Sequence, residues 1–201
     1  IGVMQTFKPA GLFVQTAGDL ILAGSIKVTD GSETDSGNPT PVGQIELRAG
    51  GSVSTGDGAA LFGDSPVVQA GGGAQIVMEG DKGDVQITAG GDVSVVVFSL
   101  DNQSSRLDVD TVATTGGDVT ILAANGIGGP IASIRGNRVQ LDARDGYIRT
   151  DLDSNILGSG GLAARARDGI EIRETAGDLL LLPPSAWAGV TTSVLATEGP
   201  V

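Results

Sequence analysis

The chain has 201 residues, of which 40% are hydrophobic and 3% aromatic, and it contains neither Cys nor His. This length and composition suit one domain with a substantial aliphatic core and exclude a disordered polar tract. The net charge of −12 disfavours nucleic acids and anionic membranes as partners, and no apolar run is long enough to insert into a membrane. Without Cys and His, thiol catalysis, disulfides and the usual general base near neutral pH are excluded.

The first seventeen residues precede the regular part of the chain. The sequence begins at Ile1 with no initiator Met and no visible signal peptide, so we expect a processed protein or a piece of a larger one. Residues 1–17 are predicted to form an N-terminal strand or cap, or to continue preceding coils. Residues 18–182 carry the repeated pattern described next, and residues 183–201 are predicted to be an irregular segment or a linker to a next repeat.

A phrase recurs along residues 18–182: Gly-x-apolar-x-apolar-x-Ala, followed four residues later by another apolar residue. Clean copies begin at Gly43, Gly83 and Gly117, and further or weaker copies begin at Gly18, Asp64, Asn137, Gly160 and Gly177. Successive starts lie 25, 21, 19, 34, 20, 23 and 17 residues apart. The interval of 34 has room for one extra irregular coil around Leu107 and Val109. Such a recurrence indicates one structural unit stacked on itself.

The content of the phrase indicates what the unit is. Apolar and polar residues alternate, as in a strand, and turn-forming residues separate the copies. No stretch of ten or more residues has helical apolar spacing. These features predict an all-β fold, a β-solenoid and most simply a right-handed parallel β-helix, with coils of about 20 residues. Ile87, Ile121 and Leu141 are expected to point inward and to stack in adjacent or near-adjacent coils.

The longest polar stretch runs from Asp30 to Pro41. Its side-chain oxygens make Asp30, Glu33 and Asp35 candidate calcium ligands. Their order does not match an EF-hand loop, so a loop protruding between coils is the favoured interpretation. No other cofactor or metal site is predicted.

The carboxylates do not form a recognisable catalytic arrangement. Most are single and lie at predicted turns, and Asp151 and Asp153 share a face only if they lie on a strand. Aromatic platforms for sugars are scarce, with one Trp and one Tyr in the chain. We therefore predict no catalytic or cofactor-binding residue, and a protein that is not an enzyme.

The charge is unevenly distributed. Residues 1–134 carry 5 basic and 15 acidic groups, whereas residues 135–173 carry seven Arg and six acidic groups. Ala-Arg-Asp-Gly occurs at 143–146 and again at 166–169, so these side chains are expected to stack into an alternating charge ladder. A solvated, salt-bridged face is favoured over a binding patch. Arg165, Arg167 and Arg173 of this basic region, together with Trp187, are the candidate residues for end-to-end assembly with the acidic front of the chain.

The repeats resemble a known family. Segments 83–93, 117–127 and 177–182, each opening with Gly-Asp before a run of apolar positions, resemble the repeats of filamentous-haemagglutinin-type exoproteins, which are giant β-helical bacterial surface adhesins. The resemblance covers most of residues 18–182. The Asn-Pro-Asn-Gly signature of the family's secretion domain is absent, so the resemblance implies a shaft segment with no catalytic residue.

The predicted function follows from this fold and this resemblance. We expect a structural segment of an extracellular or cell-surface adhesin or filament in a bacterium, acting as a stiff spacer and adhesive surface. The expected partners are neighbouring repeats or further copies of the chain, end to end, and host or matrix glycans or proteins. Two alternatives remain open: a self-assembling extracellular filament subunit, and a polysaccharide-acting β-helix enzyme, which predicts an acidic groove.

Overall fold

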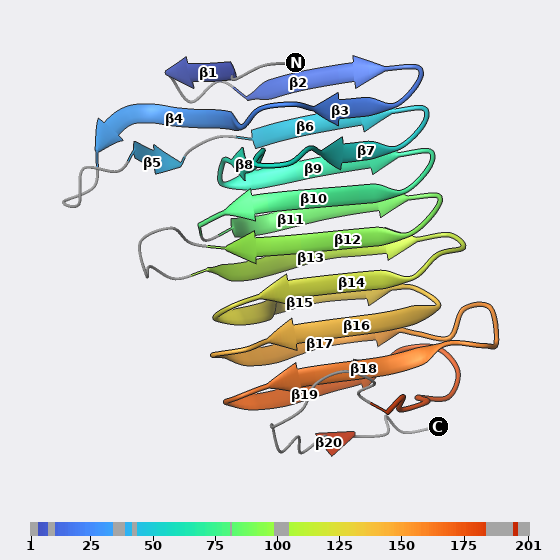
Figure 1. Cartoon of the computed structure of the whole chain (residues 1–201). Coiled ribbons are helices and arrows are strands. Elements are labelled where there is room, and N and C mark those ends of the chain that lie inside the picture. Colours follow the sequence, from blue (N-terminus) through green and yellow to red (C-terminus); the bar gives the residue numbers. More distant parts are fainter. Residues whose placement is uncertain are drawn as a thin grey trace.

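The chain winds into a parallel β-solenoid whose coils each contribute strands to two facing sheets (Figure 1). A computed structural model describes residues 4–7, 11–33, 39–41, 44–80, 82–98, 105–183 and 195–196. Every regular element among these residues is a strand. Successive coils are spaced by about 22 residues, which confirms the predicted fold class and coil length.

The two sheets are named here sheet A and sheet B. Sheet A contains β1 (Met4–Phe7), β3 (Leu20–Leu22), β4 (Ile26–Glu33), β5 (Pro39–Pro41), β7 (Val53–Thr55), β8 (Leu61–Phe62), β10 (Ala74–Glu79), β12 (Val93–Phe98), β14 (Val119–Ala123), β16 (Arg138–Ala143) and β18 (Gly161–Ala166). Sheet B contains β2 (Leu12–Thr16), β6 (Gln44–Ala49), β9 (Ser65–Ala70), β11 (Lys82–Ala89), β13 (Arg106–Thr114), β15 (Gly126–Arg135), β17 (Tyr147–Asp153), β19 (Gly169–Glu174) and β20 (Leu195–Ala196).

Strands of successive coils pair in parallel, so residues at the same phase stack directly. In sheet B the inward ladder runs through Leu47, Val68, Ile87, Val112, Ile134 and Leu152, each completely buried. The described exception to parallel pairing is the β4–β5 hairpin, which is antiparallel. The aliphatic residues that alternate within the phrase thus fill the space between the sheets, because one face of each strand turns away from water.

The phrase does not keep to one sheet. The copies that begin at 43, 64 and 83 form β6, β9 and β11 of sheet B, whereas those that begin at 117, 137 and 160 form β14, β16 and β18 of sheet A. The interval of 34 residues therefore spans about one and a half turns. Leu107 and Val109 lie in the added strand, β13, and are buried.

This half-turn shift corrects one detail of the stacking prediction. Ile87, Ile121 and Leu141 are all fully buried, and Ile121 pairs directly with Leu141. Ile87 lies in the opposite sheet, between Val68 and Val112, so it faces the other two across the core rather than continuing their ladder.

The small residues of the phrase lie at a tight bend between the sheets. A Cβ built on Gly71 would lie 2.1 Å from the carbonyl oxygen of Gly50 in the previous coil, far inside van der Waals contact. The bend is nevertheless hydrogen-bonded from coil to coil, with Gly71 N donating to Ala49 O at 3.0 Å and Gly72 N to Gly51 O at 2.9 Å. Glycine is therefore required here by the close approach of two backbones.

Candidate functional site

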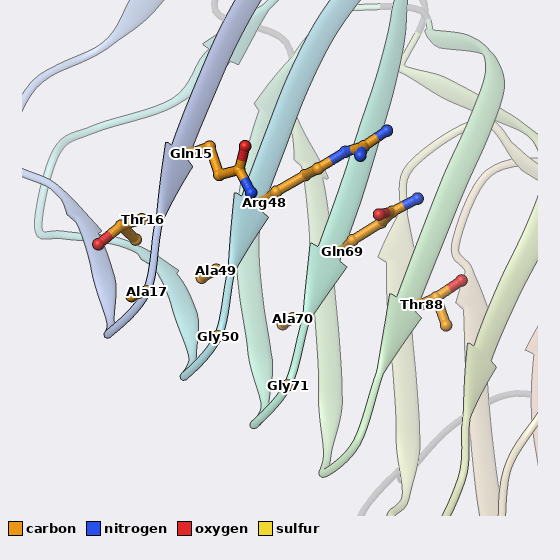
Figure 2. A pocket seen from close by; sticks show the side chains of 10 residues that line it. All are labelled: Gln15, Thr16, Ala17, Arg48, Ala49, Gly50, Gln69, Ala70, Gly71 and Thr88. Carbon is orange, nitrogen blue, oxygen red and sulfur yellow. The ribbon is translucent and has the colours of Figure 1, made fainter.

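A polar groove follows the bend at one margin of sheet B. Four successive strands, β2, β6, β9 and β11, contribute to it, and it encloses about 590 Å³ (Figure 2). We call it the corner groove; its lining residues are Gln15, Thr16, Ala17, Arg48, Ala49, Gly50, Gln69, Ala70, Gly71 and Thr88.

One wall of the corner groove is a ladder of polar side chains. Gln15 pairs in register with Arg48, Arg48 with Gln69, and Gln69 with Thr88. Figure 2 shows these four side chains side by side on neighbouring strands, all projecting away from the sheet. Because neighbouring strands are about 4.8 Å apart, the wall offers amide, guanidinium and hydroxyl groups at that interval along the rod.

The charge of the wall is partly neutralised by its neighbours. Arg48 Nη2 lies 2.5 Å from Glu46 Oε1, and its guanidinium carbon lies 5.5 Å from the centre of the Phe13 ring. A cation over an aromatic face and beside a carboxylate is held in place while its remaining N–H donors stay usable. Arg48 therefore offers directed hydrogen-bond donors, while the ion pair that it forms with Glu46 has little net charge.

The floor of the corner groove is backbone. Ala17, Gly50 and Gly71 occupy successive bends. A Cβ on Gly50 would lie 2.2 Å from Ala17 O, and a Cβ on Gly71 would lie 2.1 Å from Gly50 O. The same packing that forbids side chains at the bend leaves a hollow beside the polar wall. The site can bind and align an extended polar ligand by hydrogen bonds.

Sequence reasoning did not single out these groove residues, although a signal for them exists. Arg48, Gln69 and Thr88 each stand directly before the repeated Ala of their copy of the phrase. Alignment of the copies by that Ala would have shown three hydrogen-bonding side chains on the outer face of neighbouring strands.

The candidate assembly residue Arg165 lies on the outer face of sheet A in a largely buried ion pair. Its Nη2 lies 2.9 Å from Asp142 Oδ2 and its Nε 3.2 Å from Asp142 Oδ1, in a bidentate geometry. The two side chains are only 14% and 8% exposed. Asp142 and Arg165 are register partners in β16 and β18, so the pair ties two coils together.

We predict that Arg165→Ala lowers the free energy of unfolding by about 3 kcal/mol, because it leaves the Asp142 carboxylate buried without this partner. Urea unfolding followed by circular dichroism measures the change. Arg173→Ala is the matched control and should cost less than about 1 kcal/mol, since its pair with Asp151 is solvent-exposed. Equal losses for the two variants would contradict the role given to burial.

The predicted charge ladder is present in part in the C-terminal coils, through Arg167. Arg167 Nε donates to Asp168 Oδ1 at 2.9 Å, and Arg167 Nη1 lies 3.5 Å from Asp145 of the preceding coil. The hydrogen bond from Arg167 lowers the pKa of the Asp168 carboxyl below its ordinary value. Arg173 likewise donates through Nε to Asp151 Oδ1 at 2.9 Å. These exposed pairs form the salt-bridged face that the sequence favours.

Asp151 and Asp153 do share the outer face of a strand, β17, but each is engaged by an arginine. Asp151 accepts from Arg173, and Asp153 accepts from Arg135 Nε at 2.8 Å. At the adjoining bend Glu174 accepts hydrogen bonds from both Ser154 N and Ser154 Oγ, at 2.8 and 2.9 Å. Desolvation raises the pKa of Glu174, and the Ser154 hydrogen bonds oppose that rise. The arrangement serves to hold neighbouring coils together.

The remaining predicted site residues lie largely outside what the structure describes. Asp30 and Glu33 belong to β4, where the structure describes their backbone only. Asp35 and Trp187 fall outside the described residues. Within the described ranges, no group of three or more acidic side chains is placed to hold a metal ion. The calcium prediction for Asp30, Glu33 and Asp35 stays a prediction.

Comparison with known proteins adds no family to this fold. The sequence matches no protein-family model, and searches of curated proteins and of solved structures find no significant similarity. Within the described residues, no helix has the length and hydrophobicity to cross a bilayer. The structure supports a β-helical repeat protein, and the resemblance to filamentous-haemagglutinin-type exoproteins remains a sequence-based prediction.

Proposed function

We propose that this chain is a non-catalytic structural segment of an extracellular bacterial adhesin or filament, acting as a stiff spacer that carries an adhesive surface. The observation that supports it most is continuity. Paired strands follow one another from β2 to β19 in sheet B and from β3 to β18 in sheet A. Each coil packs its aliphatic residues against the facing sheet and against both neighbouring coils, and its strands hydrogen-bond to those coils, so the rod resists bending along its whole length.

The corner groove is the adhesive surface that we favour. Three of its four wall side chains, Gln15, Gln69 and Thr88, are neutral hydrogen-bonding groups, and its one cation, Arg48, is paired with Glu46. The net charge of −12 repels polyanions at a distance. These features fit a neutral, hydroxyl-rich linear polymer lying along the rod axis, so matrix or host glycans are the proposed ligand class.

Binding of neutral polysaccharides tests this function. The purified chain should be retained on an immobilised neutral β-glucan more strongly than on an anionic polysaccharide such as hyaluronan. Arg48→Ala should weaken the retention about three- to tenfold, the effect of losing one or two hydrogen bonds. Arg149→Ala is the matched control: it also removes a paired arginine of sheet B, far from the corner groove.

Two results would count against the proposal. Retention that is equal for Arg48→Ala and Arg149→Ala would exclude the corner groove as the binding surface. Release of reducing sugars from the polysaccharide would contradict the non-catalytic function and favour the alternative of a polysaccharide-acting enzyme. For the latter, catalysis by paired carboxylates requires an acidic groove, and none of the ten residues lining the corner groove is acidic.

Location is tested separately from binding. An antibody raised against the purified chain should label intact cells of the producing bacterium. Label that appears only after the cells are lysed would contradict the surface assignment. The alternative of a free filament subunit predicts self-association.

A further inference from the structure

A second polar hollow lies across the bend from the corner groove. It encloses about 470 Å³ on the outer face of sheet A, where β7, β10 and β12 follow one another down the rod (Figure 1). Its wall is a ladder of hydroxyl and amide groups, because Ser54, Gln75 and Ser94 are register partners on these three strands. We call it the serine groove; its lining residues are Ser52, Val53, Ser54, Gly73, Gln75, Asp92 and Ser94.

In other coils a carboxylate closes the corresponding place beside the bend. Ser52 N donates to Asp19 Oδ1 at 2.7 Å. In the same way Asp118 N donates to Asp92 Oδ1 at 2.9 Å, and Arg138 N donates to Asp118 Oδ1 at 3.0 Å. The donor and the acceptor of each bond stand one coil apart, at the same phase of the solenoid. A carboxylate of one coil therefore caps a backbone N–H of the next.

Two successive N–H groups inside the serine groove lack such a cap. Among the described residues, neither Gly73 N nor Asp92 N donates a hydrogen bond. At the phase of the other caps, the residue one coil earlier is Ser52 for Gly73 and Gly73 itself for Asp92, so neither brings a carboxylate. Backbone N–H groups in folded proteins are nearly always paired, so these two donors are open to a partner from outside the chain.

The side chain of Ser52 has the direction of a capping aspartate but not its length. Ser52 Oγ lies 2.6 Å from where Gly72 would carry a Cβ, just as Asp19 Oδ1 lies 2.1 Å from where Gly51 would carry one. Both side chains thus lie over the glycine of the next coil. The serine oxygen is one bond closer to its own backbone than a carboxylate oxygen, so the serine leaves the hollow beside Gly73 N open.

Spacing and charge determine which acceptor fits the two open N–H groups. Neighbouring strands are about 4.8 Å apart, so the acceptors have to be two oxygens at that interval along the rod. None of the lining residues is a cation and Asp92 is an anion, so a ligand carboxylate or phosphate would be repelled. Hydroxyl or carbonyl oxygens of a neutral ligand avoid this repulsion. The serine hydroxyls and the Gln75 amide both donate and accept, which suits a ligand rich in hydroxyl groups.

We infer that the serine groove is a second binding site for a neutral saccharide, whose oxygens accept hydrogen bonds from Gly73 N and Asp92 N where other coils supply a carboxylate. The inference deepens the proposed function and rests on it for the ligand class. Gly50 and Gly71 line the corner groove, and Ser52 and Gly73 follow them by two residues, so the two grooves flank one bend. The rod can therefore hold a saccharide chain on each side of that bend.

Nuclear magnetic resonance of the backbone amides tests the two donors directly. A soluble β-glucan hexasaccharide added to the isotope-labelled chain should shift the amide signals of Gly73 and Asp92. Ser52→Asp supplies the missing carboxylate, so it should abolish the shift at Gly73 and weaken binding in this groove at least about threefold. Its fold should be retained, because the new carboxylate accepts from Gly73 N as Asp19 does from Ser52 N. Gln140→Asp is the matched control: it adds the same charge to the outer face of sheet A, beyond the groove.

The outcomes separate this inference from the proposed function. Saturable shifts at Gly73 and Asp92 that persist in Gln140→Asp, with the Gly73 shift lost in Ser52→Asp, support the serine groove. Shifts confined to Arg48 and its neighbours overturn the serine groove and leave the corner groove intact. A Gly73 shift that survives Ser52→Asp overturns the capping geometry, and stronger binding of an oligogalacturonate of the same length overturns the neutral ligand class. Unchanged signals throughout the chain overturn both sites.

Discussion

Replacing Ile121 by Asp should unfold the solenoid. Ile121 is fully buried in β14, and its register partners Val95 and Leu141 lie directly on either side of it in the same ladder. An aspartate there would place a charge between two aliphatic side chains with no partner, at a cost of about 4 kcal/mol or more. For a chain of this size that is a large share of the total stability, which is typically about 5–15 kcal/mol.

The neighbouring residue supplies the control for this change. Thr120 precedes Ile121 on the same strand but points to the outer face of sheet A, where it is partly exposed. Thr120→Asp should therefore change the free energy of unfolding by no more than about 0.5 kcal/mol. Far-UV circular dichroism during heating measures both variants. If Ile121→Asp melts within a degree or two of the parent, the inward register assigned to β14 is wrong.

Gly71→Ala should strongly destabilise the solenoid at the bend between the sheets. The new Cβ would lie 2.1 Å from Gly50 O and 2.9 Å from Gly50 C, both backbone atoms that cannot rotate away. The coil has to shift, and the hydrogen bond from Gly71 N to Ala49 O is strained with it. We expect a loss of about 2–3 kcal/mol, in the range of overpacking in a tightly packed interior.

The same methyl group at Gly18 is the control, because a Cβ there meets no atom within 4 Å. Gly18→Ala should be neutral or slightly stabilising, since alanine restricts the unfolded chain. Urea unfolding of the two variants measures the difference. Equal stability of Gly71→Ala and Gly18→Ala would show that the coils are farther apart at the bend than the structure has them.

The fold could be predicted from the sequence because the phrase of alternating apolar residues is repeated along the chain. Alternation at Ile121 and Leu141 sets their inward direction, and the small residue that follows each strand marks the bend. Sheet membership could not be predicted in the same way, because the phrase is identical in both sheets and nothing local distinguishes Ile87 from Ile121. Only the long-range pairing of β11 with β9 and β13 assigns Ile87 to sheet B.

The candidate site was harder to predict than the fold. The sequence singled out Arg165 only as an assembly residue, and its buried ion pair with Asp142 depends on the register that places the two side chains on neighbouring strands. The corner groove needs both the outward position of Arg48 and Gln69 and the hollow left by the glycine bend beside them. A hollow is a property of several coils together, so no single copy of the phrase contains it.

The half-turn shift of the phrase gives the rod two different sides. In the first half, the residues before the repeated Ala are Arg48, Gln69 and Thr88, and they project from sheet B. In the second half, the same place in the phrase is held by Leu122, Asp142 and Arg165, which project from sheet A. The hydrogen-bonding wall lies on the outer face of sheet B, and the ion pair between Asp142 and Arg165 lies on the outer face of sheet A. A flat surface that touches one of them therefore cannot also touch the other. A rod built in this way can lie on one partner and leave its opposite side free for a second.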